Sequence, residues 1–476
     1  MPGRRGISRG LVAPVADSAA GVGYPADMAL SQYGSDSGNR RPRVVVVGGG
    51  FAGFQAAGSV RRRWGDAAEV VLVNPTDYFL YLPLLPEVAT GVLEPRRITV
   101  SLPAALPGVR LALGEVDGVD LERRRVEWAD PEGGRGGIGY DRLVLAAGSV
   151  NKLLPIPGVT EHAHGFRGIP EALHLRDQVI RQLEMAATSD DPDERTARCT
   201  IVVVGAGYTG TEVAALGPLL TDSLARRLPG LRGQRVRWLL LDVADRVLPG
   251  LDERLARTAD RVLRERGVEV RTGESVQEAH ADGVRLSTGE EVPTRTIVWC
   301  VGVRPDPLVE GLGLATRQGR LVVDEYLRVP GHPDVFACGD AAAVPDSTRP
   351  GELTAMTAQH AVRQGRLAGR NVSASLGRGP SRRYRHHDLG FVVELGGREA
   401  AANPLRVPLS GLPAKAVTRG YHLLSMPGNR VRTAADWAID AVQQRQTVQL
   451  GLVPHHAVPL ESSSPEVPGR WPTQIR

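Results

Sequence analysis

Residues 43–53 read R-V-V-V-V-G-G-G-F-A-G, and this stretch decides the fold. Four consecutive valines predict a strand that is buried on both faces, as in the centre of a parallel sheet. Gly48, Gly50 and Gly53 then follow the G-x-G-x-x-G spacing, and a helical stretch comes directly after them. The first glycine allows a tight turn, the second lets a pyrophosphate approach the backbone, and the third lets the helix pack closely on the strand. The stretch therefore predicts a dinucleotide site with the phosphates at a helix N-terminus.

A second copy of this pattern lies near the middle of the chain. Residues 200–210 read T-I-V-V-V-G-A-G-Y-T-G, with the same spacing on Gly205, Gly207 and Gly210. One such turn is weak evidence, because glycine-rich turns also occur for steric reasons. Two copies, each between a buried strand and a helix, predict two dinucleotide-binding domains. We expect such a chain to move electrons between two bound nucleotides.

The residue that ends the second strand of each unit is the candidate for binding the ribose of the nucleotide. An acidic side chain about 20 residues beyond the last glycine can hold the ribose hydroxyls. In the second unit this residue is Asp242, which favours NADH and disfavours a 2′-phosphate, although Arg246 lies near enough to temper the preference. In the first unit it is Asn74, which can hydrogen-bond a hydroxyl without charge assistance. Asp77 is the alternative there, and turn formation explains both residues equally well.

Small residues follow two further buried strands. Residues 141–148 read D-R-L-V-L-A-A-G, and Ala147 and Gly148 would let the chain pass close to a cofactor and cross to the next domain. Gly302 follows a later predicted strand and is assigned to the second nucleotide. The stretch 78–91 is too apolar for an ordinary surface loop and is predicted to lie near the first cofactor.

Composition and charge limit the number of domains, the partners and the location that we expect. With 476 residues the chain is long enough for two or three domains. Its formal charge of +5 is spread without a dense basic patch, so we expect no nucleic-acid partner. The three cysteines form no C-x-x-C pair, which predicts reduced thiols and a cytoplasmic location. The sequence also has no apolar run approaching the roughly 18 residues of a transmembrane helix.

No metal site is predicted from the sequence. The cysteines lack the spacing of metal ligands. The adjacent pairs His386 with His387 and His455 with His456 lie in polar stretches without suitably spaced carboxylates. We therefore expect no metal ion to take part in the chemistry.

Residues 319–344 read G-R-L-V-V-D-E-Y-L-R-V-P-G-H-P-D-V-F-A-C-G-D-A-A-A-V. This stretch resembles the second flavin-contacting motif of the flavoproteins that have two dinucleotide-binding domains. The resemblance implies that Asp340 binds the ribityl chain or the flavin phosphate and that Gly339 allows close approach. It also implies that the first glycine turn holds FAD. The other interpretation of Asp340 is a helix N-cap.

Within that superfamily the chain resembles the type II NADH dehydrogenases, which are single-subunit NADH:quinone oxidoreductases. The resemblance runs from about residue 41 to about residue 445. It is carried by Y-L-P-L-L-P-E-V-A-T-G (81–91), Y-T-G-T-E-V-A (208–214), I-V-W-C-V-G-V-R-P-D-P-L (297–308) and A-Q-H-A-V-R-Q-G (358–365). It implies an FAD-dependent enzyme that takes hydride from NADH and passes two electrons to a quinone without pumping protons.

The resemblance also implies roles for residues within these stretches. Glu212 would lie near the flavin and the nicotinamide and relay protons to the quinone, although a helix dipole also stabilises a glutamate in the first turn. Ala358, Gln359 and Ala361 would line the quinone pocket, with Gln359 acting in catalysis. Arg363 stands where the family has glutamine, which favours a more polar or anionic acceptor.

The C-terminal region from about residue 384 resembles the family's membrane-associating module. A predicted helix within 420–442 places small apolar residues on one face: Val431, Ala434, Ala435, Ala438 and Val442. Interfacial helices usually carry larger apolar residues on that face. Such a stripe suits three contacts: a membrane surface through 412–442 (at the cytoplasmic face of the cell membrane), the chain's own core, or a second protomer in a homodimer.

Other chemistries compete on this fold. Disulfide reduction needs a cysteine pair near residues 83–91, and the sequence has none there. A sulfide:quinone reductase needs redox cysteines that face the flavin, and Cys300 and Cys338 keep that alternative open, although buried inert thiols suit both positions. A soluble NAD(P)H reductase for another acceptor, such as a ferredoxin-like protein, and a low-turnover NADH-sensing flavoprotein are further alternatives.

The predicted fold class is α/β, with two Rossmann-like dinucleotide-binding domains, one for FAD and one for NAD, and a C-terminal α+β module for membrane association or dimerisation. The FAD domain is discontinuous, because its second motif follows the NAD domain. The predicted ranges are a disordered tail (1–40, with Met28 as an alternative start), the first segment of the FAD domain (41–155), the NAD domain (156–308), the second segment of the FAD domain (309–372), the C-terminal module (373–450) and a second disordered tail (451–476).

Overall fold

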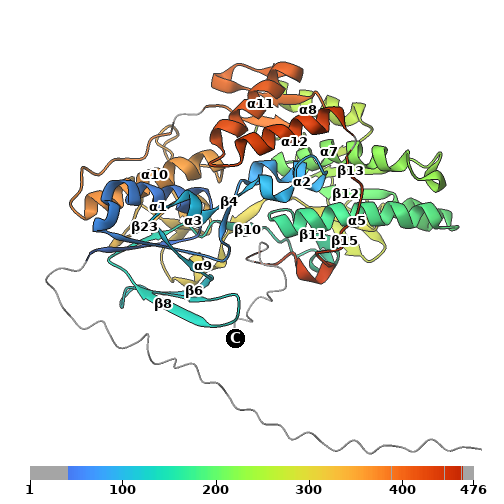
Figure 1. Ribbon diagram of the computed structural model, residues 1–476. Helices are drawn as coiled ribbons and strands as arrows, with labels where there is room; N and C mark the ends of the chain where they lie inside the picture. The colour runs from blue at the N-terminus through green and yellow to red at the C-terminus, as the bar shows by residue number, and fades with distance from the viewer. Residues whose placement is uncertain (1–40, 387–388, 444, 463, 465–476) are drawn as a thin grey trace, which may run out of the picture. The chain divides into compact units, whose positions relative to one another are not determined.

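The computed structural model describes residues 41–386, 389–443, 445–462 and 464. The predicted tail at 1–40 and the end of the second tail at 465–476 lie outside these residues. In Figure 1 strands and helices alternate along the described chain, and the two largest sheets are built mainly of parallel strands. The α/β class is therefore confirmed.

The first sheet has six strands in the order β22-β23-β9-β1-β2-β5. Its strands are β22 (Arg328–Val329), β23 (His332–Ala337), β9 (Arg142–Leu145), β1 (Arg43–Val47), β2 (Glu69–Asn74) and β5 (Arg110–Leu113). β1 pairs in parallel with β2 and β9, and its four valines are at most 3% exposed. β23 joins this sheet from beyond the second domain by pairing with β9, so the first domain is discontinuous.

Two helices that are distant in sequence lie side by side, α1 (Phe51–Trp64) and α10 (Ala358–Ser375) (Figure 1). Two glycines of α10 allow the close packing. A Cβ added at Gly365 would lie 2.0 Å from the carbonyl oxygen of Ala52, and one at Gly369 would lie 2.6 Å from that of Ala56. The A-Q-H-A stretch is thereby held against the helix of the first glycine turn.

The second sheet has five parallel strands in the order β11-β18-β12-β13-β14. These strands are β11 (Ala163–His164), β18 (Thr296–Trp299), β12 (Thr200–Val204), β13 (Arg237–Asp242) and β14 (Glu269–Thr272). The helices of this region of the chain are α4 (Val159–His162), α5 (Ile169–Thr188), α6 (Pro192–Arg198), α7 (Tyr208–Ala225) and α8 (Glu253–Glu265). β12 lies between β18 and β13 in this sheet, as β1 lies between β9 and β2 in the first sheet. All five residues of β12 are buried.

The remaining strands form short sheets. β10 (Ser149–Asn151) pairs antiparallel with β19 (Val303–Pro305) where the chain crosses between the two domains. The other strands are β3 (Tyr78–Leu80), β4 (Thr99–Ser101), β6 (Glu115–Asp120), β7 (Arg125–Ala129), β8 (Arg135–Gly139), β15 (Val276–His280), β16 (Gly283–Leu286), β17 (Glu291–Pro293), β20 (Thr316–Arg317), β21 (Arg320–Val322) and β24 (Ala342–Ala343). The short helices among them are α2 (Leu85–Ala89), α3 (Leu102–Ala105) and α9 (Pro307–Gly311).

The C-terminal module combines a small antiparallel sheet with two helices. Its elements are β25 (Val392–Glu394), β26 (Ala400–Ala402), β27 (Leu409–Ser410), α11 (Gly411–Ser425) and α12 (Arg430–Val442). α12 buries Thr433 and Trp437, and the Trp437 indole donates a hydrogen bond to Glu87 at 2.5 Å. Val431 and Val442, on the predicted alanine-rich face, are 83% and 82% exposed. That face does not dock on the chain's own core, so that alternative is wrong.

The segment that follows α12 runs along α5. The Asp177 carboxylate accepts hydrogen bonds from the backbone N–H groups of Leu450 and Gly451, and the Asn151 amide donates to the carbonyl of Leu460. Leu460 is only 1% exposed. The prediction of a disordered tail is therefore wrong for residues 451–462. Residues 451–462 are held by side chains of elements that are distant in sequence, so their order could not be predicted from the segment alone.

Among the described helices, none has the length and apolarity needed to cross a membrane.

Candidate functional site

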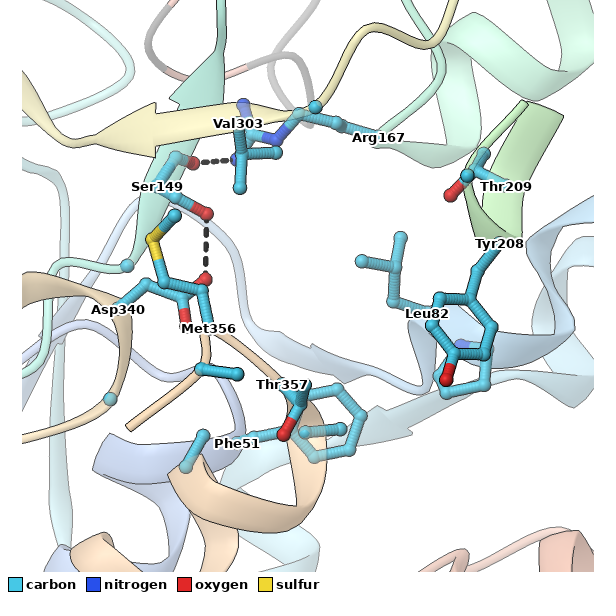
Figure 2. A pocket seen from close by; sticks show the side chains of 18 of the residues that line it. Phe51, Leu82, Ser149, Arg167, Tyr208, Thr209, Val303, Asp340, Met356 and Thr357 are labelled. Carbon is cyan, nitrogen blue, oxygen red and sulfur yellow. Dashed lines mark hydrogen bonds between the residues drawn. The ribbon is translucent and has the colours of Figure 1, made fainter. Parts of the chain in front are cut away.

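Both glycine turns open into one cavity of about 1800 Å³. A pocket for a single drug-sized ligand has about 300–1,000 Å³. The cavity therefore has room for more than one such ligand, and it is lined by Gly48 and Gly50 from the first turn and by Gly205 and Gly207 from the second. Figure 2 shows Phe51 and Tyr208, the first residues of the helices after the two turns, lining the same pocket.

The three glycines of the first turn have three different positions. Gly48 has φ +91°, and a Cβ there would lie 2.3 Å from the carbonyl oxygen of Ala146. Gly50 has nothing within 4 Å of an added Cβ, so its face is open to a ligand. Gly53 lies beneath the turn, outside the residues that line the cavity, because a Cβ there would lie 1.7 Å from the Gly48 oxygen. These positions match the roles expected from the spacing.

The second turn repeats this geometry. Gly205 has φ +103°, Gly207 is open, and a Cβ at Gly210 would lie 1.8 Å from the Gly205 oxygen. Gly50 and Gly207 are the N-caps of α1 and α7, and both have φ −70° and ψ −166°. Each helix thus presents free N–H groups and a partial positive charge to the cavity, which fits a pyrophosphate.

Asn74 and Asp242 occupy equivalent places at the ends of β2 and β13, and both line the cavity. The Asn74 oxygen accepts a hydrogen bond from Gly49 N at 2.6 Å, and an Asp242 oxygen accepts one from Ala206 N at 2.5 Å. Each side chain therefore also holds its own glycine turn. The Asn74 amide donates to Thr76, which accounts for the turn that the sequence suggested.

The two substitutes suggested by the sequence lie elsewhere. Asp77 is not among the residues that line the cavity. The guanidinium of Arg246 donates to the backbone oxygens of Pro249 and Leu251, and Arg246 does not line the cavity either. Neither substitute therefore lines the cavity, whereas Asn74 and Asp242 both do.

Asp340 lies across the cavity from the second turn, and its carboxylate accepts a hydrogen bond from the Ser149 hydroxyl at 2.8 Å (Figure 2). Arg167 donates to the carbonyl oxygen of Ser149. Burial raises the pKa of Asp340, and Ser149, Arg167 and Arg320 oppose the rise. In this position Asp340 lies in a short 3-10 turn that starts at Gly339 and does not cap a helix, so the N-cap interpretation is wrong.

The cavity walls beside Asp340 are formed by small residues, which leave room for a flat ring system. Ala147 and Gly148 line the cavity at the end of β9, and Gly302 lines it after β18. Gly339 has φ +71°, and its N–H donates to the side chain of Gln364 at 2.8 Å. An open glycine turn, walls made of small residues and a half-buried carboxylate fit FAD.

The N-terminal turns of α10 form another wall. Ala358, Gln359 and Ala361 line the cavity, whereas Arg363 does not. Instead, the Arg363 guanidinium donates to the side-chain oxygen of Gln359 at 3.2 Å, and the Gln359 amide donates to Gly390 O at 2.5 Å. The prediction that Arg363 lines the pocket is therefore wrong, and Arg363 instead contacts Gln359, which does line it.

A cluster of charged side chains lies where α7, α2 and the C-terminal module meet, with Glu87, Glu394 and Lys415 buried and Glu212 half-buried. Glu212 accepts a hydrogen bond from the backbone N–H of Glu394 at 2.9 Å, and the Glu394 carboxylate forms an ion pair with Lys415. Burial raises the pKa of Glu212 well above its usual value, and the charges of Glu394 and Glu87 add to the rise. Burial also raises the pKa of Glu87 to about 7. Glu87 can therefore hold a proton near neutral pH, and the pKa of Glu212 is shifted in the same direction.

Sequence reasoning missed several of these residues. Glu87 had a signal, because it is the acidic residue in the apolar stretch 78–91. Ser149, Arg167 and Lys415 belong to no motif. They enter the site only through β10, the segment before α5, and α11.

Cys300 and Cys338 also line the cavity. Burial raises the pKa of each thiol to about 12. At neutral pH both are therefore protonated and poor nucleophiles, because the thiolate is the reactive form. This favours the interpretation of inert thiols over a redox role.

Comparisons with known proteins agree with this geometry. The family model described as "Pyridine nucleotide-disulphide oxidoreductase" matches residues 42–365. The Type II NADH:quinone oxidoreductase Ndh of Mycobacterium tuberculosis is 30% identical over 425 residues, which cover 86% of this chain and 89% of that protein. The Demethylphylloquinone reductase NdbB of Synechocystis is 30% identical over 396 residues, which cover 81% of this chain and 93% of that protein.

A solved structure shows the same fold. NDH2 from Plasmodium falciparum, in complex with NADH, superposes with a TM-score of 0.79 at 17% identity, and the match covers 86% of this chain and 100% of that chain. The fold, the shared cavity and the relatives lead to one conclusion. The chain belongs to the pyridine nucleotide-disulphide oxidoreductase family and, within it, to the flavin-dependent type II NADH:quinone oxidoreductases.

Proposed function

We propose that this protein oxidises NADH and reduces a quinone, with FAD at the first glycine turn and NADH at the second. The observation that carries the proposal is the single cavity, which both turns and the N-terminal turns of α10 line. FAD, when bound, accepts a hydride from NADH and passes two electrons to the quinone. The chain's own residues bind, orient and supply protons.

Binding and orientation fall to the two turns and their partners. Gly50 and Gly207 leave the helix N-termini open for the two pyrophosphates. Asp242 binds the adenosine ribose of NADH and repels a 2′-phosphate, so NADH is preferred over NADPH. Asp340, held by Ser149, binds the ribityl side of FAD.

Quinone reduction needs protons, and the charged cluster can supply them. Glu212 lines the cavity, and desolvation raises its pKa well above the usual value for a glutamate. We assign Glu212 as the residue that passes a proton toward the quinone. Gln359, fixed by Gly390 and Arg363, is assigned to orient the quinone, with Ala358 and Ala361 beside it.

Steady-state kinetics with a panel of acceptors test the assignment. The purified protein should carry FAD absorbance, which NADH bleaches and a soluble quinone analogue restores. Quinone should be reduced faster than ferredoxin, and sulfide should not replace NADH as donor. A colourless protein that does not take up added FAD would sink the proposal, as would bleaching without reoxidation by any quinone.

The outer face of the C-terminal module is proposed to contact the membrane surface that supplies the quinone, at its cytoplasmic side. Apolar residues of α11 and α12 are exposed, with Leu424 at 77%, Val431 at 83% and Val442 at 82%. Arg430 and Arg432 flank Val431 and are also exposed. Apolar side chains beside basic ones are typical of helices that lie on anionic bilayers.

Vesicle sedimentation tests this contact. Binding to vesicles with anionic lipid should fall in a Leu424→Asp, Val431→Asp double variant and persist in Met185→Asp, a control on α5 where the side chain is 43% exposed. Light scattering of the same proteins tests the alternative that a second protomer binds this face. If the double variant turned a dimer into a monomer while vesicle binding stayed absent in all proteins, the face would be a homodimer interface instead.

A further inference from the structure

Three histidines from distant regions of the chain meet outside the cavity. His164 lies on β11, His174 on α5, and His455 on the short 3-10 turn His455–Ala457. One ring nitrogen from each lies within 4.8 Å of the other two. The ring centroids of His164 and His174 are 4.5 Å apart, and those of His164 and His455 are 4.7 Å apart.

The hydrogen bonds of two rings fix which nitrogen carries the proton. His174 Nδ1 lies 2.9 Å from the carbonyl oxygen of Val453, and His455 Nε2 lies 3.1 Å from that of Glu161. A carbonyl only accepts, so these nitrogens are the donors in the neutral rings. His174 Nε2 and His455 Nδ1 are left with free lone pairs. This is the pattern of metal-binding histidines, whose second nitrogen donates to a carbonyl or carboxylate.

Two ring nitrogens of the histidine cluster are buried without a hydrogen-bond partner among the described residues. Within the stretches of chain that the structure describes, His164 Nδ1 and His174 Nε2 have no hydrogen-bond partner, and the two side chains are 4% and 2% exposed. Buried polar atoms are rarely left unpaired, and an ion is one physical reason for an apparent exception. Burial also lowers the pKa of both rings, which keeps their lone pairs available.

We propose that His164, His174 and His455 bind one divalent transition-metal cation of the Zn²⁺ class. Three imidazole nitrogens are a known protein ligand set for Zn²⁺, with water in a fourth position. Imidazole also suits Ni²⁺ and Cu²⁺, whereas Mg²⁺ and Ca²⁺ require oxygen ligands that this cluster does not offer.

The position of the cluster gives the cation a structural role. None of the three histidines lines the nucleotide cavity. His455 belongs to the segment 445–462, and His164 and His174 belong to the edge strand and a helix of the NAD-binding domain. A shared cation fastens the C-terminal segment to that domain, in addition to the bonds that Asp177 already makes.

The sequence predicted no metal site, because His164, His174 and His455 are far apart in the chain and only adjacent histidine pairs were apparent from it. His455 and His456 are adjacent, and both are exposed. Only His455 faces the other two rings. The pair therefore provides a variant and a matched control that differ by one position.

Zinc binding is the test, with untagged, full-length, FAD-loaded protein stripped of metal by chelation. We expect the wild type to take up one Zn²⁺ per chain in equilibrium dialysis with elemental analysis. His455→Gln should weaken binding ~10-fold or more, and His456→Gln should leave it within ~2-fold. FAD content checks that each variant is folded. No stoichiometric uptake by the wild type would overturn the site, because water would then satisfy the nitrogens. Equal losses in both variants would overturn it too.

Limited proteolysis tests the fastening role independently of activity. Zn²⁺ should slow cleavage within 445–462 in the wild type and in His456→Gln, and should have no such effect in His455→Gln. If zinc bound to the wild type without slowing cleavage, the structural role would be wrong.

Discussion

Glu212, in the first turns of the helix that follows the second glycine turn, accepts a hydrogen bond from the backbone N–H of Glu394 at 2.9 Å. The contact joins the NAD-binding domain to the C-terminal module directly at the cavity wall. Glu212 is only partly exposed, and desolvation and the nearby carboxylates of Glu394 and Glu87 raise its pKa well above its usual value. The residue that we assign to proton supply therefore owes part of its environment to the C-terminal module.

Replacing Glu212 by glutamine should slow the quinone half-reaction selectively. Glutamine keeps the shape and the acceptor for Glu394 N but cannot transfer a proton. General acid catalysis is typically worth ~10²–10⁴ in rate, and water can replace part of it, so we expect kcat with quinone to fall ~10-fold or more. Stopped-flow bleaching of FAD by NADH should change less than ~2-fold. Glu253→Gln, at an exposed site on α8, is the control.

Glu87 predicts a pH dependence of stability. Burial raises its pKa from 4.5 to about 7, so the folded state binds more protons than the unfolded state between these values. Its contribution is present below about pH 4.5 and is lost as the pH rises through about 7. Glu87→Gln, which still accepts from Trp437, should remove this loss. We expect the variant to gain on the order of 1–3 kcal/mol over the wild type between pH 5 and pH 8.

Chemical unfolding of the FAD-loaded proteins at pH 5, 6 and 8 measures this difference. Glu122→Gln, at an exposed position in the turn between β6 and β7, controls for a general charge effect. A constant difference between wild type and Glu87→Gln at all three pH values would contradict the assignment.

Asp242 is expected to set the preference for NADH. Asp242→Asn keeps an oxygen for Ala206 N, as Asn74 does for Gly49 N in the first turn, and removes the charge. We expect the ratio of kcat/KM for NADH to that for NADPH to fall ~10-fold, because repulsion of the 2′-phosphate is lost. FAD binding should not change. An unaltered ratio would mean that the charge does not discriminate.

Arg363 should act on quinone binding through Gln359. Arg363→Gln removes the bond to the Gln359 oxygen, and a net hydrogen bond of about 1 kcal/mol corresponds to ~5-fold in affinity. The KM for quinone should rise by about that factor, with the KM for NADH unchanged. Arg370→Gln, exposed on the same helix, should alter neither constant.

The two cysteines of the cavity should be dispensable. Cys300→Ala with Cys338→Ala should keep NADH:quinone turnover within ~2-fold, because both thiols are protonated at neutral pH. Loss of turnover with FAD still bound would reopen a redox role for these cysteines.

The sequence by itself determined the two nucleotide turns. Gly48, Gly50 and Gly53 and their second copy adopt the predicted geometry because the turn is built from a strand, a loop and a helix that are contiguous in the chain. The positions of Asn74 and Asp242 could also be predicted from the sequence, because a fixed spacing from the glycine turn places each at the end of the neighbouring strand.

Only the tertiary structure decided which distant side chains meet. Glu212 meets Glu394, and His174 meets His455, through packing of elements that are far apart in sequence. The same packing turned the alanine-rich face of α12 outward, fixed Gly451 on α5 and fixed Leu460 on β10. Local spacing specifies a turn because its own atoms make the contacts, whereas a cluster exists only once separate elements have buried their common surface.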